Sequence, residues 1–162
     1  LRLLHSGKPR LVIRKSLRYI IAHIVVYDPD GDKTIVFAHS KELKKLGFPA
    51  PKRNIPTAYL VGLLIAKKAC NSSIREAIPD FGLHPGIKGT LPMAVLKGAR
   101  DGGLIIPFHD SILPEQNRIE GRHIAHYAQH NKERFIHYGM NPDELPRIIN
   151  EVKQKLISDE NR

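Results

Sequence analysis

The sequence predicts an α/β fold: a mixed sheet that begins with an N-terminal antiparallel meander, helices packed on it, and a helical C-terminal extension. Three observations support this. Three segments rich in β-branched and aromatic residues fall within the first 40 residues. Helix-length segments with apolar residues at helical spacing then alternate with short apolar segments. The last third is polar and carries equal numbers of basic and acidic residues.

The meander is predicted from three strand-like segments, 10–15 (RLVIRK), 19–27 (YIIAHIVVY) and 33–39 (KTIVFAH). The last two are joined by residues 28–32 (DPDGD), whose composition is typical of a hairpin turn. Its three aspartates do not match a calcium-binding EF-hand loop, because the glycine falls too early and no glutamate closes the pattern. We therefore expect a turn and no bound calcium.

The later elements are predicted from capping residues and apolar spacing. Ser40 and Gly47 bound a short helix, Asn54 or Thr57 caps the next helix, and Pro79 limits a strand to a sheet edge. We expect an α/β core over residues 1–110 and a helical extension over 111–162. The elements are a helix at 40–46, a loop at 48–56, a helix at 56–70, a strand at 74–81, a Gly-rich loop at 82–90, a helix at 91–101, a last strand at 104–108, and helices at 115–130 and 143–158.

The net charge of +10 points to a polyanionic partner. Residues 1–56 hold 12 basic and 4 acidic side chains, whereas residues 114–162 hold 8 of each. A membrane partner is not expected, because no apolar stretch approaches the roughly 20 residues of a span and no signal peptide opens the chain. A single cysteine excludes an internal disulfide and favours the cytoplasm. The chain starts at Leu1, so we expect some N-terminal sequence to be missing.

Neither the histidines of the last third nor the single cysteine indicates a chemical site. His123, His126 and His130 share one face of a predicted helix, but no carboxylate or thiolate completes a zinc site. Cys70 lies among apolar neighbours, which predicts a buried structural thiol. We expect no catalytic residue, cofactor or metal ion. Lys88, in the Gly-rich loop before a predicted helix, could hold an RNA phosphate, or the loop could be a plain connector.

The first strand and the turn after it carry the strongest functional signal. Leu11 and Ile13 are predicted to face the core, with the intervening side chains pointing away. Cations, a hydroxyl and an aromatic ring on one exposed edge suit contacts to RNA phosphate and ribose, although charges can also simply protect an edge strand from aggregation. The candidate RNA-binding residues are Arg10, Arg14, Lys15, Ser16, Arg18 and Tyr19, together with Lys52 and Arg53 of the following basic loop and Lys88.

Four long stretches of the chain are characteristic when taken together: residues 7–43, 54–69, 82–107 and 112–128. The first of them reads GKPRLVIRKSLRYIIAHIVVYDPDGDKTIVFAHSKEL. These stretches resemble one family, the universal large-subunit ribosomal protein eighteen, in its archaeal branch, which is similar to the eukaryotic large-subunit protein five. They span most of the chain in the family's order, and their joint occurrence is highly specific.

This resemblance implies a ribonuclease H-like ribosomal fold without catalytic carboxylates. It implies binding to 5S rRNA and attachment of 5S rRNA to the large-subunit rRNA in the central protuberance, beside neighbouring ribosomal proteins. By matching positions it also implies RNA contacts by Lys8, Arg10, Arg14, Lys15, Ser16 and Arg18. Family members often have asparagine where this chain has Leu17, and the family's basic N-terminal tail is mostly absent here.

Two other functions remain open at this point. A ribonuclease H-like nuclease would need several carboxylates converging on magnesium, and the predicted strands supply only Glu76 and Asp80. A non-ribosomal RNA-binding module would show the same basic surface. The charge-neutral last third is expected to bind ribosomal neighbours or to lie along ribosomal RNA, and to add little to 5S rRNA affinity.

Overall fold

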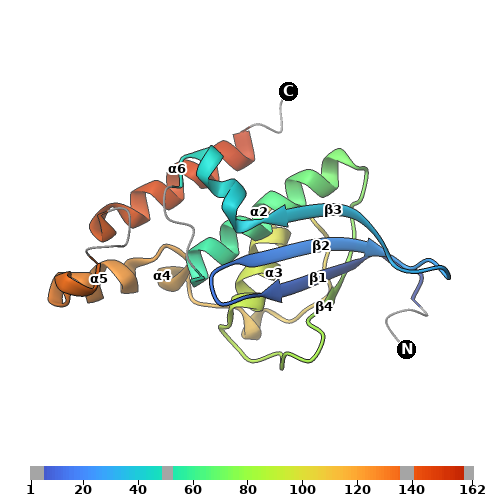
Figure 1. The fold of residues 1–162 in the computed structure, drawn as a ribbon, viewed down its shortest axis with the longest axis horizontal. Coiled ribbons are helices and arrows are strands. Elements are labelled where there is room, and N and C mark those ends of the chain that lie inside the picture. The colour runs from blue at the N-terminus through green and yellow to red at the C-terminus, as the bar shows by residue number, and fades with distance from the viewer. Residues whose placement is uncertain (1–5, 49–52, 136–140, 159–162) are drawn as a thin grey trace.

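The structure is a computed structural model that describes residues 6–48, 53–135 and 141–158. A four-stranded sheet with strand order β3-β2-β1-β4 forms its centre (Figure 1). The β1–β2 and β2–β3 pairs are antiparallel and the β1–β4 pair is parallel. This confirms the mixed sheet and its N-terminal meander. The strands are β1 (Arg10–Lys15), β2 (Ile20–Val26), β3 (Lys33–His39) and β4 (Ile78–Asp80).

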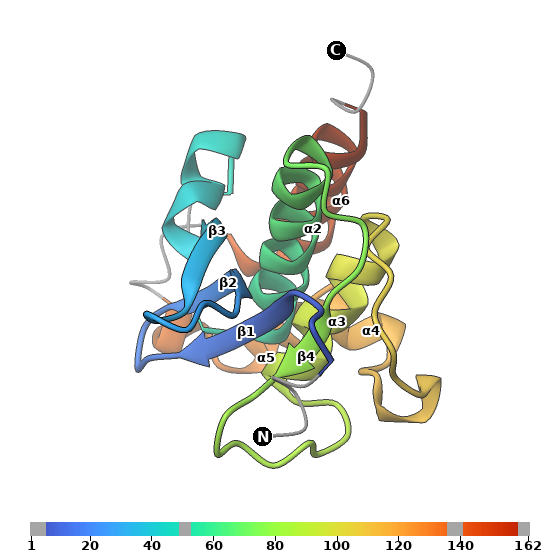
Figure 2. The ribbon, with the colours of Figure 1, turned by 90° about the vertical axis from the view of Figure 1, so that its right-hand side faces the viewer.

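Helices cover one face of this sheet. Figure 2 shows α2 and α3 beside the sheet with α6 behind α2, whereas no described helix lies over the opposite face. That second face of the sheet, called the open face below, is therefore accessible to a partner. The helices are η1 (Ser40–Leu46), α2 (Ile55–Asn71), α3 (Leu91–Asp101), η2 (Asp110–Ile112), α4 (Gln116–Ile119), α5 (Arg122–His130), η3 (Lys132–Phe135), η4 (Pro142–Glu144) and α6 (Leu145–Ser158).

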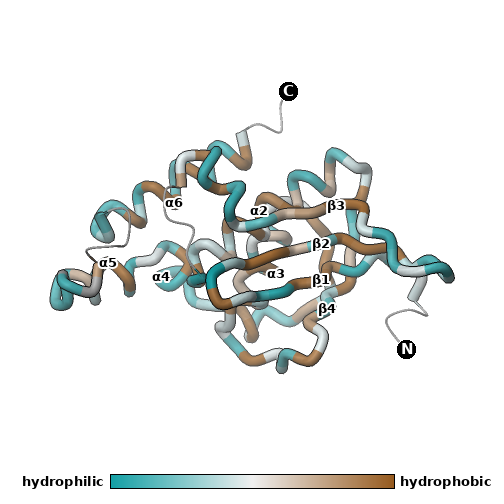
Figure 3. Tube along the Cα trace, viewed as in Figure 1, coloured by the Kyte–Doolittle hydropathy of each residue, from teal (hydrophilic) through white to brown (hydrophobic). Residues whose placement is uncertain are grey.

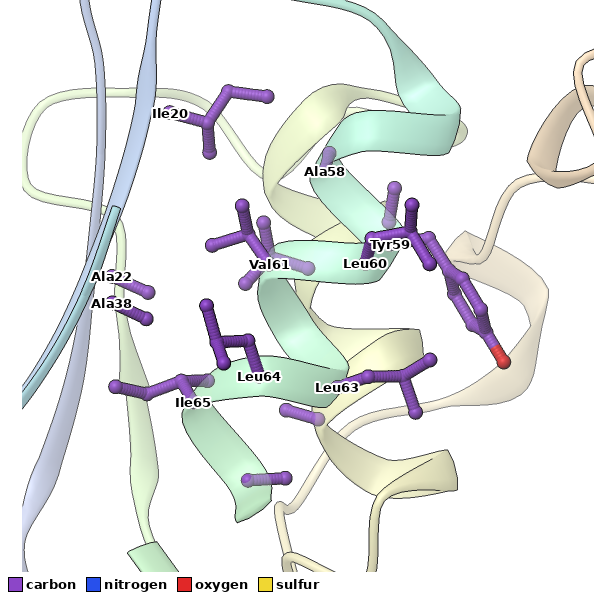
Figure 4. Close-up of a cluster of buried hydrophobic side chains, with 14 of the residues drawn as sticks. Ile20, Ala22, Ala38, Ala58, Tyr59, Leu60, Val61, Leu63, Leu64 and Ile65 are labelled. Carbon is purple, nitrogen blue, oxygen red and sulfur yellow. The ribbon is translucent and has the colours of Figure 1, made fainter. Parts of the chain in front are cut away.

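The core lies between the sheet and α2, where apolar segments of the chain concentrate (Figure 3). Leu11 and Ile13 of β1 are 0% and 2% exposed, as the alternation of the strand predicts. Small residues, Ala22 and Ala38, face α2 from the middle of the sheet, and Val61 and Ile65 fill the space opposite them (Figure 4). The helix can therefore lie close to the sheet.

The helices α2 and α3 approach each other through two glycines. A methyl group on Gly62 would overlap the carbonyl oxygen of Val95, and one on Gly98 would overlap the carbonyl oxygen of Tyr59. The two backbones are thus in direct contact at this crossing. The Tyr59 hydroxyl donates a 2.9 Å hydrogen bond to Oδ2 of Asp101 near the end of α3. Burial and this carboxylate raise the pKa of Tyr59 well above its usual range, so its proton stays in place to make the bond.

The C-terminal helix α6 packs on α2 and extends the same core. The expected helix at 115–130 is wrong in one respect, because the chain forms two helices, α4 and α5, separated at Gly121. This glycine has φ +73°, and a methyl group on it would lie 2.8 Å from Cδ2 of Leu145. Glycine therefore allows both the left-handed backbone between the two helices and the close approach of α6. The buried α6 side chains are Leu145, Ile149, Val152 and Leu156.

Capping residues and glycines in the sequence predicted most helix ends correctly. Oδ1 of Asn54 accepts a 2.9 Å bond from the backbone N–H of Thr57, and Gly47 ends η1 with φ +95°. Ser40 does not cap η1; the His39 side chain does, while the Ser40 hydroxyl is buried and accepts a bond from the backbone N–H of Ile20 at 3.3 Å. Ser40 therefore ties η1 to the sheet.

Two predicted strands are shorter than expected. Strand 74–81 is reduced to the three residues of β4, and the expected strand 104–108 contributes a single bridge between Glu76 and Ile105. Pro79 and Pro107 lack the backbone N–H that a longer ladder would need. None of the described helices combines the length and the apolar character that crossing a membrane requires.

Candidate nucleic-acid interface

The turn between β1 and β2 is a tight hairpin organised by Ser16. The backbone N–H of Ser16 donates to the carbonyl oxygen of Tyr19 at 2.9 Å. The Ser16 hydroxyl accepts from the backbone N–H of Tyr19 at 3.0 Å and of Arg18 at 3.3 Å. These bonds hold Leu17 and Arg18 at the tip of the turn. Ser16 thus builds the structure that presents Arg18 to solvent.

Three cations of this hairpin are exposed, and among the described residues none has a carboxylate partner: Arg14, Lys15 and Arg18. The Arg14 guanidinium lies against the loop after β4, because a methyl group on Gly82 would sit 2.9 Å from its Nη1 atom. A planar guanidinium matches the geometry of a phosphate group. The hairpin therefore offers positive charges that no described carboxylate neutralises, and these charges can bind an anion.

Arg10 and Lys8 are differently placed. Arg10 lies on the expected face of β1, but it is only 9% exposed, and the expectation that it points freely to solvent is wrong. Its Nη1 donates to Oδ2 of Asp80 at 3.2 Å, and its Nη2 pairs with Asp32. The parallel pairing of β4 with β1 brings Asp80 there. Lys8 is exposed but pairs with Glu76 at 2.8 Å. Their RNA contacts stay predictions.

The strand directions bring further residues to the same side. The carboxyl ends of β1, β3 and β4 meet at one edge of the sheet. We call it the carboxyl edge; it comprises the turn 16–19, the start of η1 and the loop 82–90. Lys88 is exposed in that loop. Arg53 is also exposed, just before α2, whose first turn lies beside the start of β2 (Figure 4). Lys52 lies outside the described residues.

A row of rings runs from the carboxyl edge across the open face. The Tyr19 and His39 ring centroids are 5.1 Å apart, and those of His23 and Phe37 are 5.0 Å apart. The Lys41 ammonium lies 4.6 Å from the Tyr19 ring centroid. Phe37 is 44% exposed although it is a large apolar residue. Aromatic rings beside cations form a platform on which bases or riboses can stack.

Sequence reasoning identified only Tyr19 of this row. The antiparallel register places His23 directly opposite Phe37, and a single strand does not reveal that register. The available signal was the segment 33–39, where apolar residues occupy adjacent positions instead of alternating with polar ones. Such a segment predicts apolar side chains on both faces of a strand.

The histidines of the row are held uncharged. Partial burial, and then the positive charge of Arg14, lower the pKa of His23 below its ordinary value of 6.5. Partial burial, and then Lys41, lower the pKa of His39 against the opposing effect of Glu42. Both rings are therefore neutral at pH 7 and can stack on a base without carrying charge.

Stability should fall as the pH drops below about 6.5, the histidine pKa of the unfolded chain. A histidine with a lowered pKa in the folded state binds its proton more weakly than it does in the unfolded chain. The lowered pKa therefore costs the folded state no stability above pH 6.5, and the cost grows as the pH falls towards 5. Urea unfolding at pH 7.5 and 5.5 measures this difference, and the loss should be smaller for His23→Gln. An equal loss in the variant would exclude His23 as a source.

The other candidate sites are not assembled. His126 and His130 have ring centroids 5.2 Å apart, but the described part of the chain contains no group of three or more His, Cys, Asp or Glu arranged to hold a metal ion. Cys70 is exposed, so the expectation of a buried thiol is wrong. The buried stripe of α2 passes through Ala66 and Ala69, and the next residue turns to solvent.

Comparison with known proteins identifies the family. A family model described as "Ribosomal large subunit proteins 60S L5, and 50S L18" matches residues 3–76. The large ribosomal subunit protein uL18 of the archaeon Methanococcus maripaludis is 44% identical over 166 residues, covering 96% of this chain and 86% of that protein. The chain belongs to the uL18 family.

Membership of the uL18 family makes this chain a protein of the large ribosomal subunit and confirms the resemblance found in the sequence. The matched residues 3–76 contain the meander, η1 and α2, and therefore the hairpin cations and the row of rings. The loop 82–90 and the C-terminal helices lie outside that match but within the similarity to the archaeal uL18 protein, which covers nearly the whole chain.

Proposed function

We propose that this chain is a structural constituent of the large subunit that binds 5S rRNA through the carboxyl edge and the open face. In this role it helps to attach 5S rRNA to the large-subunit rRNA in the central protuberance. The observation that carries the proposal is the rigid β1–β2 hairpin. It presents Arg14, Lys15 and Arg18, which have no carboxylate partner within the described ranges, next to the adjacent, tilted rings of Tyr19 and His39.

The parts of this surface have different roles. The three hairpin cations bind phosphates, and the rings of the open face contact bases or riboses. Because the hairpin continues directly into buried β2, the backbone that carries its cations loses little conformational freedom on binding. Arg10 and Lys8 are held by carboxylates of β4 and the segment before it, so they position β4 beside β1. Those ion pairs also engage Asp80 and Glu76, which favours an RNA-binding role over a nuclease.

The C-terminal helices serve other contacts. Residues 114–162 carry no net charge, and a surface that binds RNA by itself would be basic. We assign α5 and the exposed side of α6 to neighbouring ribosomal proteins and to the adjoining large-subunit rRNA. Co-sedimentation with large subunits separates this role from that of a non-ribosomal RNA-binding module.

A filter-binding titration tests the proposal directly. The full chain is titrated against 5S rRNA, with transfer RNA as a control of similar charge density. We expect a clear preference for 5S rRNA at physiological salt, because the fixed cations and rings match one folded RNA surface. Equal affinity for both RNAs would overturn the proposal.

Affinity for 5S rRNA should fall steeply with salt concentration. Each phosphate neutralised contributes about −0.7 to −0.9 to the slope of log K against log salt. With roughly four to eight phosphate contacts the slope should lie between about −3 and −7. Repeating the titration at several potassium chloride concentrations measures the slope. A slope near zero would show that the hairpin cations do not bind phosphates.

A further inference from the structure

We propose that Leu17 and Leu83 form a pair of apolar contacts that bind unpaired nucleotides of the RNA, between the phosphates held by the carboxyl edge. This inference rests on the proposed RNA-binding function and specifies which RNA structure the edge recognises. The two side chains are the most exposed large apolar residues in the described part of the chain, at 90% and 104%.

The topology of the sheet places both leucines at one edge. Leu17 is at the tip of the turn after β1, and Leu83 is in the loop after β4. Because β1 and β4 are parallel neighbours, these two connections leave the sheet on the same side. The Arg14 guanidinium lies at Gly82, next to Leu83 in the chain. A cation from the end of β1 thus lies against the residue that precedes Leu83.

The loop that bears Leu83 is held by its own hydrogen bonds. The backbone N–H of Gly82 donates to Oδ1 of Asp80 at 2.9 Å, and that of Gly89 donates to the carbonyl oxygen of Ile112 at 2.9 Å. Within the loop, the Thr90 hydroxyl donates to the carbonyl oxygen of Ile87 at 2.8 Å. The loop extends well away from the helices (Figure 2), so the core does not cover its apolar side chains. Figure 3 shows apolar segments within it.

The charge around the leucines favours RNA over a protein partner. No carboxylate occurs in the sequence between Asp80 and Asp101. A methyl group on Gly89 would lie 4.0 Å from Nη1 of Arg118, so cations border the loop at both ends. An exposed apolar side chain surrounded by positive charge suits a nucleobase, whose flat apolar face is flanked by phosphates. Bases in a duplex are covered by their neighbours, so the leucines can contact only bases in loops, bulges and ends.

The test compares Leu17→Ser plus Leu83→Ser with a matched control, Ile105→Ser plus Ile157→Ser. The control pair is also exposed, at 66% and 41%, but is not part of the carboxyl edge. Each protein is titrated by filter binding against 5S rRNA, a hairpin RNA with an unpaired loop, and a fully paired duplex of equal length. We expect the leucine variant to bind 5S rRNA about 10-fold more weakly than the parent, because each base stacked on a side chain contributes appreciably.

The possible results distinguish this inference from the proposed function. The salt slope of the leucine variant should equal that of the parent, since no charge changes, and its preference for the looped RNA over the duplex should disappear. If the parent binds 5S rRNA and the leucine variant binds equally well, the leucine contacts do not exist while the proposed function stands. Unchanged 5S binding with reduced incorporation into large subunits would assign the leucines to a protein neighbour and overturn the inference. Failure of the parent to bind would overturn both.

Discussion

Replacing Arg14 and Arg18 by glutamate should weaken 5S rRNA binding by about 100-fold or more, or roughly 3 kcal/mol. Charge-assisted hydrogen bonds to phosphate contribute about 1.5–3 kcal/mol each, and the introduced carboxylates add repulsion. Both side chains are exposed, and neither forms an ion pair with any residue that the structure describes. Thermal unfolding of the variant should therefore match that of the parent, and filter binding at fixed salt measures the change in affinity.

A matched control is available at the opposite edge of the sheet. Lys33→Glu plus Arg75→Glu changes the net charge by the same amount, at the start of β3 and in the segment between α2 and β4. It also removes the surface ion pair between Lys33 and Asp28, so its thermal unfolding is compared with that of the parent as well. We expect this variant to bind 5S rRNA within a few-fold of the parent. If both double variants lost affinity equally, only net charge would matter, and the carboxyl edge would not be the binding site. Arg14→Lys adds a finer test, because an ammonium keeps the charge but loses the planar fork.

The second large effect is expected in the contact between α2 and α3. Gly98→Ala should lower the free energy of unfolding by about 3 kcal/mol or more. The added methyl group would overlap the Tyr59 carbonyl oxygen and lie 3.1 Å from Cα of Gly62, so two helix backbones must separate. Alanine favours a helix over glycine by only about 1 kcal/mol, which does not offset this overlap. The midpoint of urea unfolding should fall by about 1 M or more.

Gly86→Ala is the control for this prediction. Gly86 lies in the exposed loop 82–90, and a methyl group there would meet no atom within 4 Å. Its unfolding midpoint should stay within experimental error of the parent. A Gly98→Ala protein as stable as the parent would show that α2 and α3 do not cross as closely as described. A variant that fails to fold at all supports the contact, provided that the Gly86 variant folds normally.

Local chemistry predicted most of the secondary structure. The three meander strands, α2 and α3 follow from β-branched segments, apolar spacing and the capping side chain of Asn54, all of which act between residues close in the sequence. The errors involve distant contacts. Gly121, which separates α4 from α5, has a left-handed backbone and lies close to Leu145 of α6, and residues 104–108 form a single bridge within the described part of the chain, to Glu76 in the segment before β4.

The candidate site shows the same division. Alternation along β1 placed Arg14 outward, but burial of Arg10 depends on Asp32 and Asp80, which are 22 and 70 residues away in the chain. The ring row depends on the β2–β3 register. Its members other than Tyr19 were therefore missed, although they share a face with the predicted cations. Sequence patterns predicted which charged residues lie on the outer face, whereas strand pairing determines which of them are neutralised by a carboxylate.

The parallel pairing of β1 with β4 has a consequence for the order of events during synthesis. Arg10 and its partner Ile78 are separated by 68 positions, so this ladder closes a long loop and is entropically slow to form. The β1–β2 hairpin can form from local contacts as soon as it is made. The carboxyl edge is complete only after α2 has packed on the sheet and the loop after β4 has been synthesised. A growing polypeptide therefore displays its basic turn early, whereas the surface proposed to bind RNA is complete only after the loop 82–90 has been made.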